Sequence, residues 1–168
     1  TLVLRMAKAF SGTHYYLLTE ALMSSKKAAD IIKQEKNNKK VFQMFENINI
    51  SISGTGSFYP ELNSVLAKQE FMSKEELGWL QEQSVVGDIA LRFFDKEGKE
   101  CKTEIADRMI AIDFEQFKKI DTKITIASGG YKAHTVLSAL KGKLIDVLII
   151  DYQLGQSIME LYRAETTE

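Results

Sequence analysis

Residues 122–132 read TKITIASGGYK, and this stretch decides how the rest of the chain is interpreted. A β-branched run, Ile124–Ala127, ends in Ser128–Gly129–Gly130, and Lys132 follows where a new helix is expected. Glycines let backbone N–H groups approach an anion, the helix start adds positive potential, and the lysine adds a full charge. The order strand, glycine turn, helix therefore indicates a phosphate-holding turn, although many such units turn on glycine for geometric reasons alone.

The surrounding sequence alternates between helical and strand patterns. Helical spacing or start signals occur at 1–10, 24–34, 39–46, 60–67, 73–80, 113–120, 131–141 and 153–164, and strands are expected at 48–53, 88–95, 123–127 and 145–150. Lys96–Lys99 predicts a hairpin turn with Glu100–Thr103 returning antiparallel, and the apolar run Ile145–Ile150 is typical of a strand buried on both faces. We therefore expect one domain over residues 1–168 with a layered α/β fold, a mostly parallel sheet and a β-hairpin.

Composition excludes some classes of partner. The net charge is −1 and the isoelectric point is about 6.2, whereas a free-standing nucleic-acid binder is usually basic. Cys101 is the one cysteine, so no intrachain disulfide is possible, which fits a reducing compartment. Thr1–Phe10 does not resemble a signal peptide, and no apolar run approaches the ~18 residues that span a bilayer, so we expect a cytoplasmic protein with no membrane partner. The opening on a helical pattern without methionine suggests a fragment of a longer protein.

Polar or glycine-rich junctions follow three predicted strands. They are Gly54–Thr55–Gly56, the Ser128–Gly129–Gly130 turn with Lys132, and Asp151. Ligands of open α/β sheets lie outside the carboxyl ends of the strands, so we expect the three junctions to line one cleft with a phosphate near Lys132. Asp151 or Asp88 would accept hydrogen bonds from sugar hydroxyl groups. The alternative for Asp151 is that it only caps the last helix.

The remaining polar residues give no catalytic pattern. Arg92 stands in a predicted strand and points either to solvent or into the cleft, because alternation does not decide between the two. His14 and His134 are isolated, Cys101 has no neighbouring Cys or His, and no nucleophile-elbow or P-loop motif occurs. We therefore expect no catalytic residue, no metal, no cofactor and no enzymatic activity.

Five segments together resemble the SorC-type sugar-binding domain, the effector module of bacterial transcriptional regulators related to the sorbitol and deoxyribonucleoside operon repressors. The segments are Ile52–Gly56, Val86–Asp95 followed by Gly98, Asp107–Ile112, Ile126–Ala133 and Val147–Asp151. The resemblance implies a fold akin to sugar-phosphate isomerases and deaminases, with a phosphorylated sugar as inducer. It also implies that Lys132 belongs to the phosphate site, together with Ser128, Gly129 and Gly130.

Two departures from the family pattern matter. Ser128 stands where the family has its first glycine. A serine still offers a backbone N–H and adds a hydroxyl group, but its side chain restricts the backbone conformations that the turn can adopt. By comparison with the family, the chain lacks the helix-turn-helix and the first part of the effector domain, whose glycine- and threonine-containing loop helps grip the phosphate. DNA contact is therefore expected only through a domain missing here, and exposed apolar surface with homo-oligomer formation is expected for this chain.

Three functions follow from these observations. The leading one is an effector-sensing domain that binds a phosphorylated sugar non-covalently and couples binding to oligomer packing and DNA affinity. The second is a sugar-phosphate isomerase or deaminase, which would need a positioned general base. The third is a dimerisation module whose ligand site is incomplete.

Overall fold

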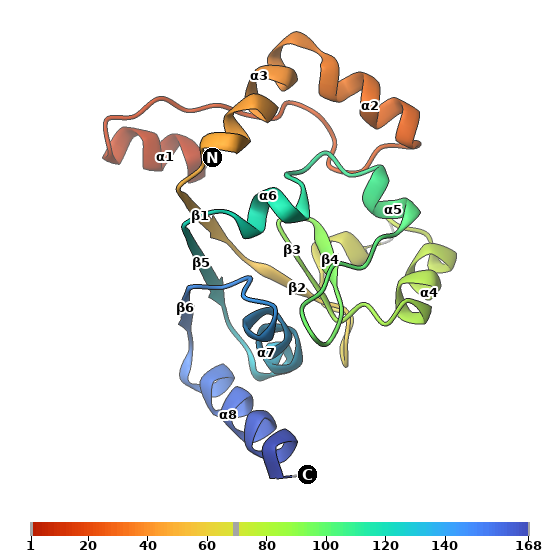
Figure 1. Ribbon diagram of the computed structural model, residues 1–168, viewed down its shortest axis with the longest axis vertical. Coiled ribbons are helices and arrows are strands. Elements are labelled where there is room, and N and C mark those ends of the chain that lie inside the picture. Colours follow the sequence, from red (N-terminus) through yellow and green to blue (C-terminus); the bar gives the residue numbers. More distant parts are fainter. Residues whose placement is uncertain (1, 69–70, 168) are drawn as a thin grey trace.

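Two three-stranded sheets form the centre of the protein. The computed structural model describes residues 2–68 and 71–167 (Figure 1). The parallel sheet has the order β1 (Ile50–Ser53), β5 (Thr122–Ala127) and β6 (Val147–Ile150), and the antiparallel sheet has the order β2 (Thr55–Ser57), β3 (Gly87–Ile89) and β4 (Arg92–Phe94). The helices are α1 (Leu2–Ala9), α2 (Lys26–Gln34), α3 (Lys36–Met44), α4 (Lys74–Glu82), α5 (Glu104–Asp107), α6 (Phe114–Lys118), α7 (Ala133–Lys141) and α8 (Tyr152–Thr167), with 3-10 turns η1 (Phe45–Asn47), η2 (Val65–Ala67) and η3 (Gly130–Lys132). The predicted α/β class is confirmed.

The parallel sheet is covered on one face only. On the covered face, Ala127, Leu148 and Ile150 join the core that α7 and α8 supply through residues such as Val136 and Leu154. On the other face, β6 exposes Val147 and Ile149. The expectation that Ile145–Ile150 is buried on both faces is therefore wrong. It failed because helices and the antiparallel sheet lie to one side of these strands in Figure 1, and no described element lies on the other.

The hairpin is shorter than predicted and turns earlier. Residues 88–95 do not form one strand, because Ala90 and Leu91 adopt φ of 49° and 64° and reverse the chain between β3 and β4. This two-residue turn carries neither glycine nor asparagine, so its usual signal was absent. Lys96–Lys99 does turn, with Gly98 N–H donating to the Asp95 carbonyl. Glu100–Thr103 forms no strand; Glu100 makes an antiparallel bridge to Phe94, and Cys101 N–H donates to the Phe93 carbonyl.

Side-chain caps set several helix starts. Ser25 caps α2, Ser73 and Glu76 form a reciprocal capping box on α4, and Thr103 caps α5. The helix start predicted at Pro60 is wrong, since only the three-residue turn η2 forms near the end of that segment.

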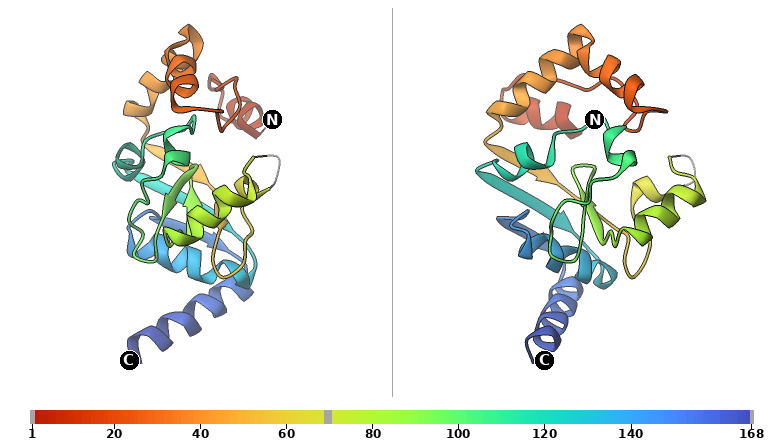
Figure 2. Two further views of the ribbon diagram at one scale, coloured as in Figure 1. Left: turned by 90° about the vertical axis from the view of Figure 1, so that its right-hand side faces the viewer. Right: turned by 45° about the vertical axis from the view of Figure 1, so that its right-hand side comes forward.

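Two apolar cores stabilise the fold. One lies between the parallel sheet, α6, α7 and α8, and the other lies under the antiparallel sheet against α4 and α5. Helices α1 to α3 gather at one end of the molecule and α8 extends at the other (Figure 2). No helix in residues 2–68 and 71–167 is both long and apolar enough to cross a membrane.

Candidate functional site

The carboxyl ends of β1, β5 and β6 meet at one edge of the parallel sheet. Ser53 pairs with Thr125 and Ala127 pairs with Ile150, so the residues that follow these strands are neighbours. Backbone at Gly54 lies near the Ile126 carbonyl, within van der Waals reach of any added Cβ. The structure therefore brings the three predicted junctions to the same edge.

The glycine turn is held by Asp151. Gly129 N–H donates to Asp151 Oδ2 at 2.8 Å, and Leu154 N–H donates to Oδ1 at 2.8 Å. The backbone hydrogen bonds from Leu154 and Gly129 lower the pKa of this carboxyl. Asp151 thus caps α8, as one of the two alternatives predicted, and it also braces the turn; hydrogen bonding of Asp151 to sugar hydroxyl groups stays a prediction.

The turn itself needs its glycines. Gly129 has φ of 91°, a conformation that L-residues rarely adopt, and a Cβ there would overlap the Tyr131 ring. Gly130 lies against α8, where a Cβ would stand 2.8 Å from Ser157 Oγ. Ser128 is exposed at the start of the turn.

Lys132 joins the turn to the antiparallel sheet. Its Nζ donates a hydrogen bond to the Thr55 carbonyl at 2.9 Å and lies 5.9 Å from the centre of the Tyr131 ring. An ammonium group has three N–H donors, so two remain for an anion beside the turn. The sequence could not reveal the partner, because Thr55 contributes a backbone carbonyl rather than a side chain.

Asp88 lies behind Lys132 in a buried position. It pairs with Gly56 across β3 and β2, and its carboxylate lies so close that a Cβ on Gly56 would overlap it. Ser64 Oγ–H donates to Asp88 Oδ1 at 2.7 Å. Burial raises the pKa of Asp88 to about 6, while the Ser64 hydrogen bond and the Lys132 charge oppose the rise. Sequence reasoning missed Ser64, which lies 24 residues from Asp88 and belongs to no motif.

Arg92 does not join this group. Its buried guanidinium donates to the Ile112 carbonyl at 2.6 Å, to the Ala106 and Ala111 carbonyls at 3.2 Å, and to Asp113 at 3.1 Å. Arg92 therefore holds the 106–113 segment onto β4. Of the nine residues predicted to bind ligand, the other eight gather around the glycine turn and Lys132.

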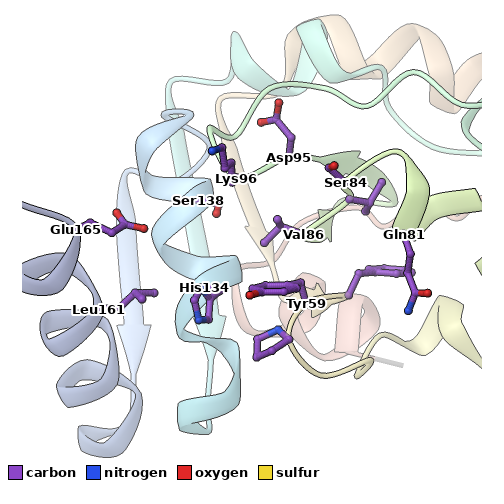
Figure 3. A pocket seen from close by; sticks show the side chains of 13 residues that line it. Tyr59, Gln81, Ser84, Val86, Asp95, Lys96, His134, Ser138, Leu161 and Glu165 are labelled. Carbon is purple, nitrogen blue, oxygen red and sulfur yellow. The ribbon is translucent and has the colours of Figure 1, made fainter. Parts of the chain in front are cut away.

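A separate cavity of about 760 Å³ opens beyond α7. Figure 3 shows Tyr59 beside His134 at one end, with Lys96 and Ser138 at the other. The Tyr59 and His134 rings meet edge to face, with centroids 5.1 Å apart. None of the nine predicted residues lines this cavity.

No group of three or more His, Cys, Asp or Glu side chains is arranged to hold a metal within residues 2–68 and 71–167. The chemistry that the glycine-turn group offers is anion binding by the Lys132 ammonium group beside the turn, next to the exposed Asp151 carboxylate, while the Asp88 carboxyl is buried behind Lys132.

A comparison with protein-family models identifies the family. The family model named "Sugar-bind", which describes a sugar-binding domain, matches residues 1–160. The chain belongs to this family. The resemblance to SorC-type effector domains is thereby confirmed, since relatives of the chain include a deoxyribonucleoside regulator and a sorbitol operon regulator.

The relatives are bacterial transcriptional regulators. The deoxyribonucleoside regulator of Bacillus subtilis is 28% identical over 91% of this chain and 48% of its own length. The sorbitol operon regulator of Klebsiella pneumoniae is 24% identical over 83% of this chain and 44% of its own length. The chain thus spans about half the length of these relatives.

Solved structures agree with this placement. A transcriptional regulator from Streptococcus pneumoniae has a TM-score of 0.85 at 27% identity, covering 97% of this chain and 62% of that one. A DeoR-family transcriptional regulator from Listeria monocytogenes has a TM-score of 0.82 at 29% identity, covering 91% of this chain and 61% of that one.

Proposed function

We propose that this sugar-binding domain is the effector-sensing part of a cytoplasmic transcriptional regulator and that it binds a phosphorylated sugar non-covalently. The phosphate would lie at the Ser128–Gly130 turn against Lys132. The observation that carries the proposal is the position of the Lys132 ammonium, which uses one donor on Thr55 and keeps two beside the turn. Ligand binding would act on oligomer packing, and DNA would be contacted by a different domain of the regulator.

The charges around the turn limit the affinity. Asp151 is bound to the turn itself and Asp88 lies close enough to feel the Lys132 charge. When both carboxyls are ionised, one ammonium faces two carboxylates, and a phosphate dianion is attracted only weakly. Further cationic or amide donors would therefore be needed for tight binding, and we expect weak binding by the 168-residue chain.

A ligand panel tests the proposal. Phosphorylated pentoses and hexoses, with deoxyribose and sorbitol phosphates chosen from the names of the relatives, should raise the melting temperature more than the same sugars without phosphate. Lys132→Ala should remove most of the difference, whereas Lys119→Ala, which deletes an exposed lysine elsewhere, should keep it. Equal weakening of both sugar classes by Lys132→Ala would contradict a phosphate contact.

One observation favours a second candidate, a sugar-phosphate isomerase or deaminase. A buried carboxyl whose pKa is raised to about 6 is the kind of group that serves as a general base. Asp88 is nevertheless enclosed by Gly56 and Ser64, which leaves it poorly placed to reach a substrate carbon. We expect no aldose–ketose interconversion; turnover that disappears in Asp88→Asn would establish the enzyme instead.

A further inference from the structure

The cavity beyond α7 lies where the two apolar cores of the protein meet. Its volume is about 760 Å³. One side is formed by α7 and α8, which pack on the core of the parallel sheet, and the other side includes Phe58 and Val85 from the core under the antiparallel sheet. Small-molecule sites typically measure about 300–1,000 Å³ and favour the places where two packed units meet. The cavity therefore has the size and the location of a ligand site.

Tyr59 gives one end of the cavity a flat aromatic wall. Its ring is 53% exposed, but its position is fixed by the edge-to-face contact with His134 and by a hydrogen bond of 3.3 Å from the Tyr59 N–H to the Val86 carbonyl. The buried side chains of Phe58, Val85 and Val86 add apolar lining. A ligand ring can stack on Tyr59 with little loss of side-chain freedom, because the tyrosine is already in place.

A buried hydroxyl group marks the other end of the cavity. Ser138 lines the cavity and is 5% exposed, and within residues 2–68 and 71–167 its Oγ has no hydrogen-bond partner. Buried hydroxyl groups are normally paired, because leaving one without a partner is unfavourable. The backbone at Ser138 is fixed, since the Gly98 backbone packs so closely on the Ser138 carbonyl that a Cβ on Gly98 would overlap it. Ser138 Oγ is thus a fixed group whose partner would come from within the cavity.

The charges around the cavity cancel. Lys96 and Asp95 both line it, and Glu165, which also lines it, pairs with Lys141 at 2.6 Å. With His134 counted as neutral, two cations face two carboxylates and the sum is zero. A strongly charged ligand is therefore not favoured here, whereas an uncharged ligand with hydroxyl groups finds both donors and acceptors.

We propose that this cavity binds an uncharged glycosyl compound, that is, a sugar ring joined to a second ring. The second ring would stack on Tyr59, and the sugar hydroxyl groups would hydrogen-bond with Ser138, Gln81 and the free carboxylate oxygens. Nucleosides and disaccharides share this chemistry. The cavity is distinct from the glycine turn, and the proposal does not depend on which ligand that turn binds.

Ligand-observed NMR with the protein and two probe classes tests the proposal. The probes are the nucleosides adenosine and thymidine and the disaccharides maltose and sucrose. We expect at least one class to bind with a Kd in the millimolar range or below. Binding by the nucleosides alone would identify the second ring as a base, and binding by the disaccharides would identify it as a sugar. No binding by either class at millimolar concentration would overturn the proposal.

Substitutions in the cavity locate the bound probe. Tyr59→Ala should weaken its binding at least about 10-fold, because ring stacking is lost. Ser138→Ala should weaken it about 3- to 10-fold, because one hydrogen bond is lost. The matched control is Tyr152→Ala, which removes an 80% exposed ring outside the cavity lining and should leave the affinity unchanged. Tyr59 is half-exposed, so Tyr59→Ala should stay folded, and unchanged affinity in this variant would overturn the proposal.

A phosphorylated probe separates the cavity from the glycine turn. Adenosine 5′-monophosphate should bind the cavity no more tightly than adenosine, because the charges there cancel. An uncharged probe whose binding is lost in Lys132→Ala and kept in Tyr59→Ala would lie at the turn, and the proposal would be wrong. Failure of phosphorylated sugars to bind would contradict the proposed function of the turn and leave the cavity result intact.

Discussion

Replacing Arg92 with lysine should damage the fold rather than ligand binding. The buried guanidinium satisfies three carbonyls, those of Ile112, Ala106 and Ala111, which lie in different directions. A lysine ammonium carries its three donors on one nitrogen and cannot occupy the separate positions of Nε, Nη1 and Nη2, so we expect two of the carbonyls to lose their partner. Hydrogen bonds from charged donors each contribute about 1.5–3 kcal/mol, so the loss should be about 3–6 kcal/mol of unfolding free energy.

Urea unfolding followed by circular dichroism measures this loss. Arg163→Lys is the matched control, because Arg163 lies exposed on α8, and it should change stability by less than about 0.5 kcal/mol. Ligand-induced stabilisation should persist in Arg92→Lys under conditions where the variant remains folded. A variant of unchanged stability that no longer binds sugar phosphates would show that the guanidinium serves the ligand, and would refute the structural role of Arg92.

Two further substitutions test the site. Burial raises the pKa of Asp88 to about 6, so the folded state binds the Asp88 proton more tightly than the unfolded chain does. The protonated carboxyl therefore contributes its full stability below about pH 4, and this contribution is lost as the pH rises to about 6. Asp88→Asn should therefore be more stable than the parent at pH 7 by up to about 3 kcal/mol, and the difference in unfolding free energy should shrink toward pH 4. Urea unfolding of both proteins across this pH range measures the difference, and a difference that does not change with pH would argue against ionisation of Asp88 as its cause. Gly129→Ala should destabilise the protein by at least about 1–2 kcal/mol, because Gly129 has a positive φ. Gly78→Ala is the control: Gly78 faces open space on α4, so this change should stabilise the protein by about 0.5–1 kcal/mol in the same urea assay. Equal effects of the two substitutions would contradict the turn geometry.

The sequence was sufficient for features that depend on local pattern. Serine followed by glutamate three residues later gave the capping box of α4, and the β-branched run before Ser128 gave β5 and its turn. The edge location of Asp151 followed from the rule that parallel strands end together. These features need no knowledge of distant residues.

Features that depend on tertiary context were not predictable. The reversal at Ala90–Leu91 uses residues with no turn preference, so packing rather than propensity sets their positive φ. Arg92 looked equally suited to solvent or a cleft, because its carbonyl partners lie 14 to 20 residues away along the chain. The exposed face of β6 could not be predicted either, because an apolar run does not indicate whether a second layer of structure packs against that face of the strand.

The hydrogen bond between Asn49 and Asp121 closes a span of 72 residues at the entry to β1 and β5. The entire antiparallel unit lies within that span, so it is an insertion whose two ends leave and return at adjacent strands. Closing so long a loop before the insertion folds is entropically unfavourable, and the insertion shortens the effective loop once it has folded. The parallel sheet should therefore assemble late, starting from the nearby β5–β6 pair, with β1 added last.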